Sequence, residues 1–421
     1  MPENPLQVAH DAFQRDDAAG LRDVLDRYPE LKSRINEPVA AFDSPVILHV
    51  RSRAMLDVLL DAGADINARS NWWAGSFGLL DCAPREVAEH AIARGAIVTV
   101  HAAARLGLVD RLRELLATDP ALVHAPGGDG KTALHFASTV EVARILLDKG
   151  AAIDARDVDH ESTAAQHLLQ EHPEVVRFLI ERGCTTDILM AAALGDRARV
   201  DSHLAADPES IRMRVSNEYF TMAGDGRAGG TIYQWTLGWY VSAVQVAKKF
   251  GHGALAQYLM DRCPPEERFL NACWLHDEAL AASLAEHAAS LPPAGRRHVA
   301  HAARNNDTKA ARLMLAAGMP VDTYSQNHAT PLHWASWHGN VELVRLLLQY
   351  DPPLENKDNQ FGATPLNWAI HGSENGWYRD RGNYGATVEA LIDAGAVLPD
   401  AAGGSEAVRE VLRIHSVDQG E

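Results

Sequence analysis

The amino-acid sequence predicts an all-α fold in which about twelve helix pairs stack in a line as an α-solenoid. Two recurring signals predict it: glycines that close apolar helical stretches at a near-constant step, and a Thr-Pro-Leu-His motif that returns between them. Of the 421 residues, 47% are hydrophobic, which is enough apolar material for a folded core and excludes a globally disordered chain. A helix pair cannot bury its apolar face alone, so neighbouring pairs must stack.

Helix ends recur along the chain at a near-constant step. The pairs of successive ends are Gly63 and Gly95, Gly150 and Gly183, and Gly318 and Asp351. Glycine suits the left-handed residue just past a helix end. The stretch before such an end has helical spacing of its apolar residues, as in Val341, Val344, Leu347 and Leu348. Each end therefore closes the second helix of a pair.

A second motif marks where each pair begins. The sequence TPLH at residues 330–333 returns one step later as TPLN at residues 364–367, and weaker copies read TALH at 132–135 and SPV at 44–46. Threonine caps a helix through its hydroxyl, and proline fits the first helical position, where no amide hydrogen is needed. The leucine that follows is expected to point into the stack.

These motifs resemble the ankyrin-repeat family. The segment ATPLHWASWHGNVELVRLLL at residues 329–348 is a near-complete match, and DGKTALH at 129–135 and AGADINA at 62–68 match well. The resemblance is strong over three stretches: residues 42–69, 129–157 and 325–396. It implies an ankyrin-type α-solenoid with a period of about 33 residues. Elsewhere the repeats are degenerate.

The repeats and their interruptions divide the chain into four parts in sequence order. N-terminal ankyrin-like repeats are expected at residues 1–215, with weaker pairs beginning near Val8, Thr99 and Ile188. An aromatic, glycine-rich insertion is expected at 216–237. C-terminal ankyrin repeats follow at 238–400, with pairs beginning near Ser242, Phe269 and His298 and a second insertion near 372–385. Residues 401–421 are expected to form a C-terminal cap and tail.

The two insertions are candidate functional loops. The step from Asp351 to the next helix-end glycine, Gly395, is clearly longer than the usual one, so additional residues must loop out of that repeat. Long loops on a rigid scaffold often carry function, although surface insertions also cost little to close. Both interpretations stay open, and the aromatic residues favour function because a tryptophan or tyrosine in a loop needs a covering partner.

The ankyrin resemblance implies a concave face lined by the exposed positions near the end of each first helix. Seven of the nine tryptophans lie between Trp235 and Trp377, which biases this face toward binding in the C-terminal half. We expect Trp334 and Trp368 to point inward as core residues. The predicted binding residues are Tyr233, Trp235, Trp239, Phe250, Trp274, Arg304, Asn305, Trp337, His338, His371, Trp377 and Tyr378.

Twenty histidines raise the question of a metal site. The resemblance assigns His135 and His333 to the structural histidine whose ring bonds the adjoining turn. His298 and His301 lie three residues apart but lack a third ligand, so no metal and no cofactor is predicted. His338 and His371 are expected on the same groove, one repeat apart, where they are candidates for acid–base chemistry.

Composition excludes several classes of partner. The formal net charge of −17 disfavours nucleic acid and anionic membranes. The sequence has no apolar run long enough to span a bilayer, its first residues do not resemble a secretory signal, and its four cysteines include no CxxC pair. A cytoplasmic location is the simplest expectation.

Two functional hypotheses follow. The leading one is a non-catalytic scaffold that recognises a protein or peptide through the concave face of the C-terminal repeats. The alternative is an enzyme or a small-molecule receptor with a Trp/His/Arg-lined pocket closed by the two insertions, in which His338 or His371 is the base and Arg304 binds an anion. No HExxH or GxSxG motif occurs, so an enzyme is the less favoured hypothesis. A closed pocket would favour the alternative, and an open trough would favour a protein partner.

Overall fold

The computed structural model describes residues 4–224, 228–399 and 401–418. Within these ranges the regular structure is helical, with four isolated β-bridges and no strand. The prediction of an all-α fold is thus confirmed. Residues 225–227 of the predicted first insertion, residue 400, and residues 419–421 of the predicted tail lie outside the described residues. No helix in the described ranges is long and apolar enough to cross a membrane.

The described chain forms two compact units. The N-terminal unit comprises residues 1–190 and 215–238, and the C-terminal unit comprises residues 191–214 and 239–421. The first insertion therefore groups with the N-terminal unit. Helix α11 (Ile188–Ala193) contains the boundary between the two.

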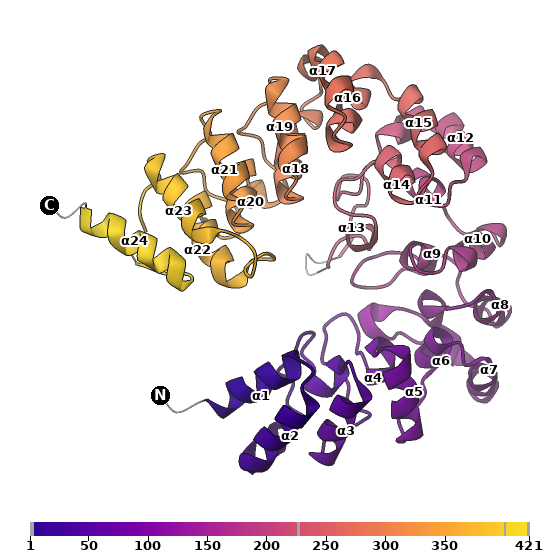
Figure 1. The fold of residues 1–421 in the computed structure, drawn as a ribbon. Helices are drawn as coiled ribbons and strands as arrows, with labels where there is room; N and C mark the ends of the chain where they lie inside the picture. The colour runs from indigo at the N-terminus through magenta and orange to yellow at the C-terminus, as the bar shows by residue number, and fades with distance from the viewer. Residues whose placement is uncertain (1–3, 225–227, 400, 419–421) are drawn as a thin grey trace. The chain divides into compact units, whose positions relative to one another are not determined.

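The N-terminal unit is a series of short helices joined by turns (Figure 1). Its elements are α1 (Pro5–Gln14), α2 (Ala18–Arg27), η1 (Pro29–Arg34), η2 (Val46–His49), α3 (Arg53–Asp61), α4 (Leu79–Cys82), α5 (Arg85–Ala93), α6 (Val100–Leu106), α7 (Val109–Thr118), η3 (Pro120–His124), η4 (Gly128–Gly130), η5 (Ala133–Phe136), α8 (Val140–Asp148), α9 (Ala164–Leu168), α10 (Pro173–Glu181) and α13 (Tyr233–Thr236), where η denotes a 3₁₀ helix.

The C-terminal unit continues the same pattern with longer first helices. Its elements are α12 (Arg197–Ala206), η6 (Pro208–Arg212), α14 (Ala243–Lys249), α15 (Gly253–Arg262), α16 (Pro265–Trp274), α17 (Glu278–Ser283), η7 (Ala285–Ser290), η8 (Gly295–Arg297), α18 (His298–Arg304), α19 (Thr308–Ala316), η9 (Gln326–His328), α20 (Pro331–Trp337), α21 (Val341–Leu348), α22 (Pro365–Asn375), α23 (Tyr384–Asp393) and α24 (Glu406–Asp418).

Successive hairpins of the C-terminal unit pack side by side in two layers. Helices α18, α20 and α22 contact one another in turn, and α19, α21 and α23 do the same in an adjacent row (Figure 1). Between the layers, Leu332, Leu343, Val344 and Leu347 have no exposed surface. This is the stacking that the periodic apolar residues require.

The predicted caps form as expected from the sequence. Thr330 Oγ1 accepts from the backbone N–H of His333, and His333 Nδ1 accepts in return from the N–H of Thr330 at 3.1 Å. Pro331 takes the first helical position. At the opposite end of a pair, Gly318 has a φ of +80°, a conformation that side chains rarely adopt. Local chemistry therefore fixes where each helix begins and ends.

Candidate functional site

The C-terminal unit contains a cavity of about 410 Å³ whose walls are mostly aromatic. Trp334 and Trp337 come from α20, Trp368 and His371 occupy the same spacing on α22, and Trp377 follows α22. We call this cavity the aromatic site. Its lining residues are Asn327, Trp334, Trp337, Phe361, Ala363, Asn367, Trp368, His371 and Trp377.

The rings of the aromatic site meet in two kinds of contact. Trp368 meets Trp334 edge to face, with ring centroids 5.2 Å apart, and meets Trp337 at 5.9 Å and 70°. Trp377 lies nearly parallel to Trp334 at 6.0 Å, and His371 nearly parallel to Trp337 at 5.8 Å. Edge-to-face contacts are favourable and directional, so the walls are held in fixed orientations.

Two of the four indoles are anchored by their N–H groups, and a third has a buried N–H without a partner. Trp334 Nε1 donates to Ser325 Oγ at 2.5 Å, and Trp368 Nε1 donates to Asp358 Oδ2 at 3.0 Å. Trp337 Nε1 is buried and has no hydrogen-bond partner among the described residues. Trp337 is thus the indole of this site with a polar group left to satisfy.

Arg304 places a cation behind these rings. Its guanidinium lies 4.1 Å from the ring centroid of Trp239, 5.4 Å from that of Trp334 and 5.9 Å from that of Trp377. The described residues offer it no ion pair, and its buried Nε has no hydrogen-bond partner. Burial lowers the pKa of Arg304 to about 10, so it stays charged at neutral pH. The aromatic faces are its main electrostatic partners.

His338 is buried beside this cation and is neutral. Its Nε2–H donates to the carbonyl of Arg304 at 2.9 Å, which leaves Nδ1 as a buried acceptor without a partner. Burial lowers the pKa of His338 to about 4, and the nearby Arg304 charge acts in the same direction. His371, by contrast, is exposed. The two histidines proposed for acid–base chemistry therefore sit in different environments.

The second insertion covers the C-terminal end of α20. Tyr384 donates its hydroxyl to the carbonyl of Trp337 at 2.8 Å, and Asn383 donates its backbone N–H to Gly339 at 2.9 Å. A Cβ on Gly382 would lie 2.6 Å from the His338 carbonyl oxygen, so only glycine fits there. These contacts set Trp377 and Tyr378 against His338, with ring centroids 5.6 and 5.0 Å away.

Trp239 and Trp274 differ from the expectation that they line an exposed groove. Both are buried, and Trp274 retains only 6% of its surface. Trp274 Nε1 donates to Nδ1 of His298 at 2.9 Å, and Trp239 Nε1 donates to Nδ1 of His301 at 3.2 Å. Burial holds the pKa of both histidines well below the usual range, so they remain neutral acceptors. These pairs belong to the core of the unit.

The first insertion is tied to the N-terminal unit. Tyr233 is fully buried, and its hydroxyl donates to Asp187 Oδ2 at 3.0 Å, whereas Trp235 two residues later is 69% exposed.

Phe250, another predicted binding residue, lies at the C-terminal end of α14 and is half-buried.

The structure gathers only part of the predicted binding set around the aromatic site. The residues brought together are Arg304, Trp337, His338, His371, Trp377 and Tyr378; Trp239 contacts Arg304 through its ring and accepts a hydrogen bond from Asn305 through its carbonyl.

Trp334, Phe361 and Trp368 also line this cavity, although the sequence analysis did not expect them there; the two tryptophans are buried, as it did expect. The first and last of these stand at equivalent positions in consecutive repeats, each four residues after the capping threonine. That equivalence was the available signal, since a large residue repeated at one position builds a continuous wall in a stack.

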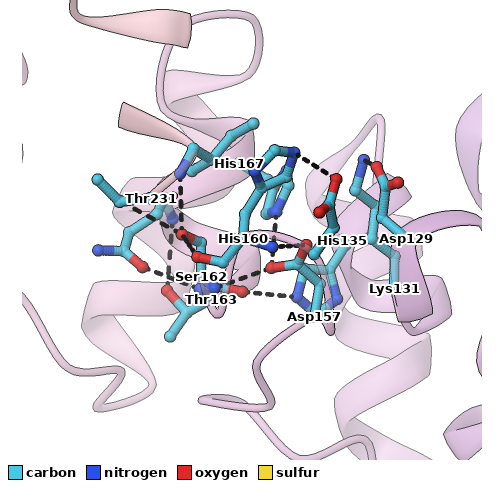
Figure 2. A network of polar contacts seen from close by, with 12 residues as sticks. Asp129, Lys131, His135, Asp157, His160, Ser162, Thr163, His167 and Thr231 are labelled. Carbon is cyan, nitrogen blue, oxygen red and sulfur yellow. Dashed lines mark hydrogen bonds and ion pairs between the residues drawn. The ribbon is translucent and has the colours of Figure 1, made fainter. Parts of the chain in front are cut away.

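Apart from the aromatic site, a cluster of polar side chains lies in the N-terminal unit (Figure 2). His135 accepts from the Thr132 N–H through Nδ1 at 3.2 Å and donates through Nε2 to the Ser162 carbonyl at 3.2 Å, so both ring nitrogens are engaged. His167 Nε2 lies 3.2 Å from Asp157 Oδ1. Burial would raise the pKa of Asp157, but His167 and two backbone N–H groups outweigh it and lower it to about 2. This group holds the repeat turns together.

The buried neutral His338 makes stability depend on pH. An unfolded histidine takes up its proton near pH 6.5, whereas folded His338 does so only near pH 4. Between these values the unfolded state holds more protons, so stability falls as pH falls. We expect His338→Gln to reduce this loss by about 3 kcal/mol between pH 7.5 and 4, measured by urea unfolding at each pH. His371→Gln is the control, and an unchanged pH profile in His338→Gln would contradict the burial argument.

Comparisons with known proteins match this architecture. A family model described as ankyrin repeats in three copies matches residues 100–193 and 299–396. The chain is 29% identical over 101 residues to the fowlpox virus (strain NVSL) ankyrin repeat protein FPV014, covering 24% of this chain and 23% of that protein. It is 37% identical over 72 residues to inversin of Canis lupus familiaris, covering 17% of this chain and 7% of inversin. The match therefore spans less than a quarter of either relative.

Among solved structures, the chain is similar to the crystal structure of the human ASB11 ankyrin repeat domain. The sequence identity is 18%, the match covers 72% of this chain and 99% of that chain, and the TM-score is 0.27.

Proposed function

The chain belongs to the ankyrin-repeat family, and from this premise we propose that it is a binding scaffold that recognises a protein or peptide through the aromatic site of its C-terminal repeats. Ankyrin repeats generally mediate protein–protein interaction. The observation that carries the proposal is a cavity walled by four indoles, one of which, Trp377, is 57% exposed. Large apolar surface open to solvent marks interaction sites, and tryptophan is the residue type most enriched in binding hot spots.

The chemistry of the walls indicates what the partner inserts. Four indoles and Phe361 present apolar faces, and two of the indole N–H groups are already bonded within the protein. A bulky apolar side chain of the partner fits these walls, since burying it releases water from both surfaces. The unbonded N–H of Trp337 is available for a carbonyl of the partner once the walls adjust.

A small-molecule receptor is the second candidate. The observation in its favour is the cavity volume of about 410 Å³, which lies within the range of about 300–1,000 Å³ found for small-molecule sites. Under this function the indoles would enclose an apolar ligand, and the charge of Arg304 behind the rings would favour one with negative charge. Native mass spectrometry of the purified protein distinguishes the two, because a receptor of this kind retains a compound of fixed mass.

Peptide selection on the full chain tests the scaffold function. We expect peptides selected from a random displayed library to be rich in bulky apolar residues and to bind Trp377→Ala at least about tenfold more weakly, since truncating a tryptophan anchor typically removes a hot spot. The readout is the dissociation constant of a labelled synthetic peptide by fluorescence anisotropy.

Trp235→Ala is the matched control for this test, because it removes another mostly exposed indole, from the other unit. It should leave peptide affinity unchanged. Peptides that bind Trp377→Ala as tightly as the unmodified chain would place the binding face elsewhere.

A further inference from the structure

Three buried side chains in the N-terminal unit present ligand atoms to one point. Asp129 lies in the short helix η4, and Asp159 and His160 lie in the turn that precedes α9. Each residue exposes less than a tenth of its surface, and one ligand atom from each lies within 4.8 Å of the others. They stand at equivalent turns of consecutive repeats, which brings them together.

In each of these side chains, one polar atom is held by a hydrogen bond to a residue outside the group of three. His160 Nδ1–H donates to the carbonyl of Gly230 at 2.8 Å. Asp159 Oδ1 accepts from the N–H of Gly229 at 2.9 Å. Asp129 Oδ1 accepts from Trp72 Nε1 at 3.0 Å. Metal-binding histidines typically donate their other ring N–H to a carbonyl or carboxylate, and ligating carboxylates are bonded in the same way.

The remaining ring nitrogen of His160 and the remaining carboxylate oxygens of Asp129 and Asp159 have no hydrogen bond with one another. In the neutral ring whose Nδ1–H donates to Gly230, Nε2 of His160 presents a lone pair, and it lies 3.7 Å from Asp159 Oδ2. A tetrahedral zinc ion with bonds near 2.1 Å places two ligand atoms about 3.4 Å apart. A lone pair that faces a carboxylate oxygen across this distance is stabilised by a cation between them.

From this arrangement we propose that Asp129, Asp159 and His160 bind a divalent transition-metal ion of the zinc type. The imidazole nitrogen favours zinc or a similar ion over Mg²⁺ and Ca²⁺, which prefer oxygen ligands. The ion completes its coordination with water. Because Gly229 and Gly230 belong to the first insertion, the metal also fastens that insertion to the repeat turns.

One residue opposes the ion. The ammonium of Lys131 lies 2.9 Å from Asp129 Oδ2, where it already neutralises one carboxylate (Figure 2). Its side chain is 16% exposed and carries a flexible four-carbon stem, so it can swing outward when a metal ion takes its place. Lys131 is therefore a competitor whose removal should strengthen metal binding.

The neighbouring set of His135, Asp157 and His167 also brings ligand atoms within 4.8 Å of one another. It is the weaker candidate, because both ring nitrogens of His135 are engaged in hydrogen bonds to Thr132 and Ser162. The two sets lie close enough that an experiment must separate them by substitution.

The test is zinc binding by the full chain after treatment with a chelator. Isothermal titration calorimetry with ZnCl₂ should show one ion per chain, with an excess of MgCl₂ leaving the affinity unchanged, and Co²⁺ should give visible d–d absorption. Asp159→Asn and His160→Gln should each weaken binding more than about tenfold, while Lys131→Met should tighten it. Zinc should also raise the melting temperature of the unmodified chain and not that of His160→Gln.

His167→Gln is the control and should retain zinc binding, with circular dichroism confirming that each variant is folded. The proposal is overturned if the unmodified chain and Lys131→Met both fail to bind zinc. It is equally overturned if His160→Gln and Asp159→Asn bind zinc as tightly as the unmodified chain, because the ion would then be held elsewhere.

Discussion

Replacing Trp368 with alanine is expected to destabilise the C-terminal unit by about 3–5 kcal/mol, the usual cost of truncating a buried tryptophan. Trp368 is 7% exposed, packs edge to face against Trp334 and Trp337, and bonds Asp358 through its indole N–H. The substitution removes these contacts and leaves one acceptor of Asp358 with fewer partners. Urea unfolding followed by circular dichroism measures the loss.

Trp235→Ala is the control for this measurement, because its ring is mostly exposed and its removal should change stability by less than about 0.5 kcal/mol. A loss below about 1 kcal/mol in Trp368→Ala would show that the walls of the aromatic site are not packed as described. It would also weaken the case for a preformed binding cavity.

Removing the carboxylate of Glu267 is expected to destabilise the same unit by about 3–5 kcal/mol, because it leaves a buried cation without its partner. Arg214 Nη2 lies 2.9 Å from Glu267 Oε2, and their side chains are only 3% and 8% exposed. Arg212 reaches the other oxygen of Glu267 at 3.3 Å. Through these contacts the segment before the first insertion is bound to α16. The measurement is urea unfolding of Glu267→Ala.

The double variant Arg214→Met/Glu267→Met separates the effect of the unpaired charge from that of lost packing. Replacing both members of a buried ion pair by apolar residues of similar volume is often close to neutral. We therefore expect the double variant to recover most of the stability that Glu267→Ala loses. Equal losses in the two would show that the pair itself, and not the stranded arginine, carries the stability.

The fold was predictable because the signals that specify it are local and repeated. The cap at Thr330 and the left-handed glycine at Gly318 each depend on residues within one turn of a helix. Repetition of these signals at a near-constant step then leaves stacking as the way to bury the apolar faces. The cavity of the aromatic site lies in the C-terminal half, where tryptophan is concentrated.

Side-chain partners distant in sequence were not predictable from the same signals. Trp274 bonds His298, 24 residues away, and Tyr233 bonds Asp187, 46 residues away. These pairings bury residues that were expected at the surface, and no periodicity in the sequence predicts them. The first insertion shows the same limit, since it bonds Asp159 and His160 about 70 residues earlier in the chain. Each contact depends on which turns the stack brings together.

The second insertion bonds α20 of the preceding repeat as well as the repeat from which it emerges. In a linear array each repeat ordinarily relies on its immediate neighbours, and the last ones fray first. An insertion that bonds both repeats raises the coupling energy between them, so the two repeats must unfold together. The repeats that contain α20 and α22 should therefore unfold together as one cooperative block, which keeps the walls of the aromatic site assembled without a partner.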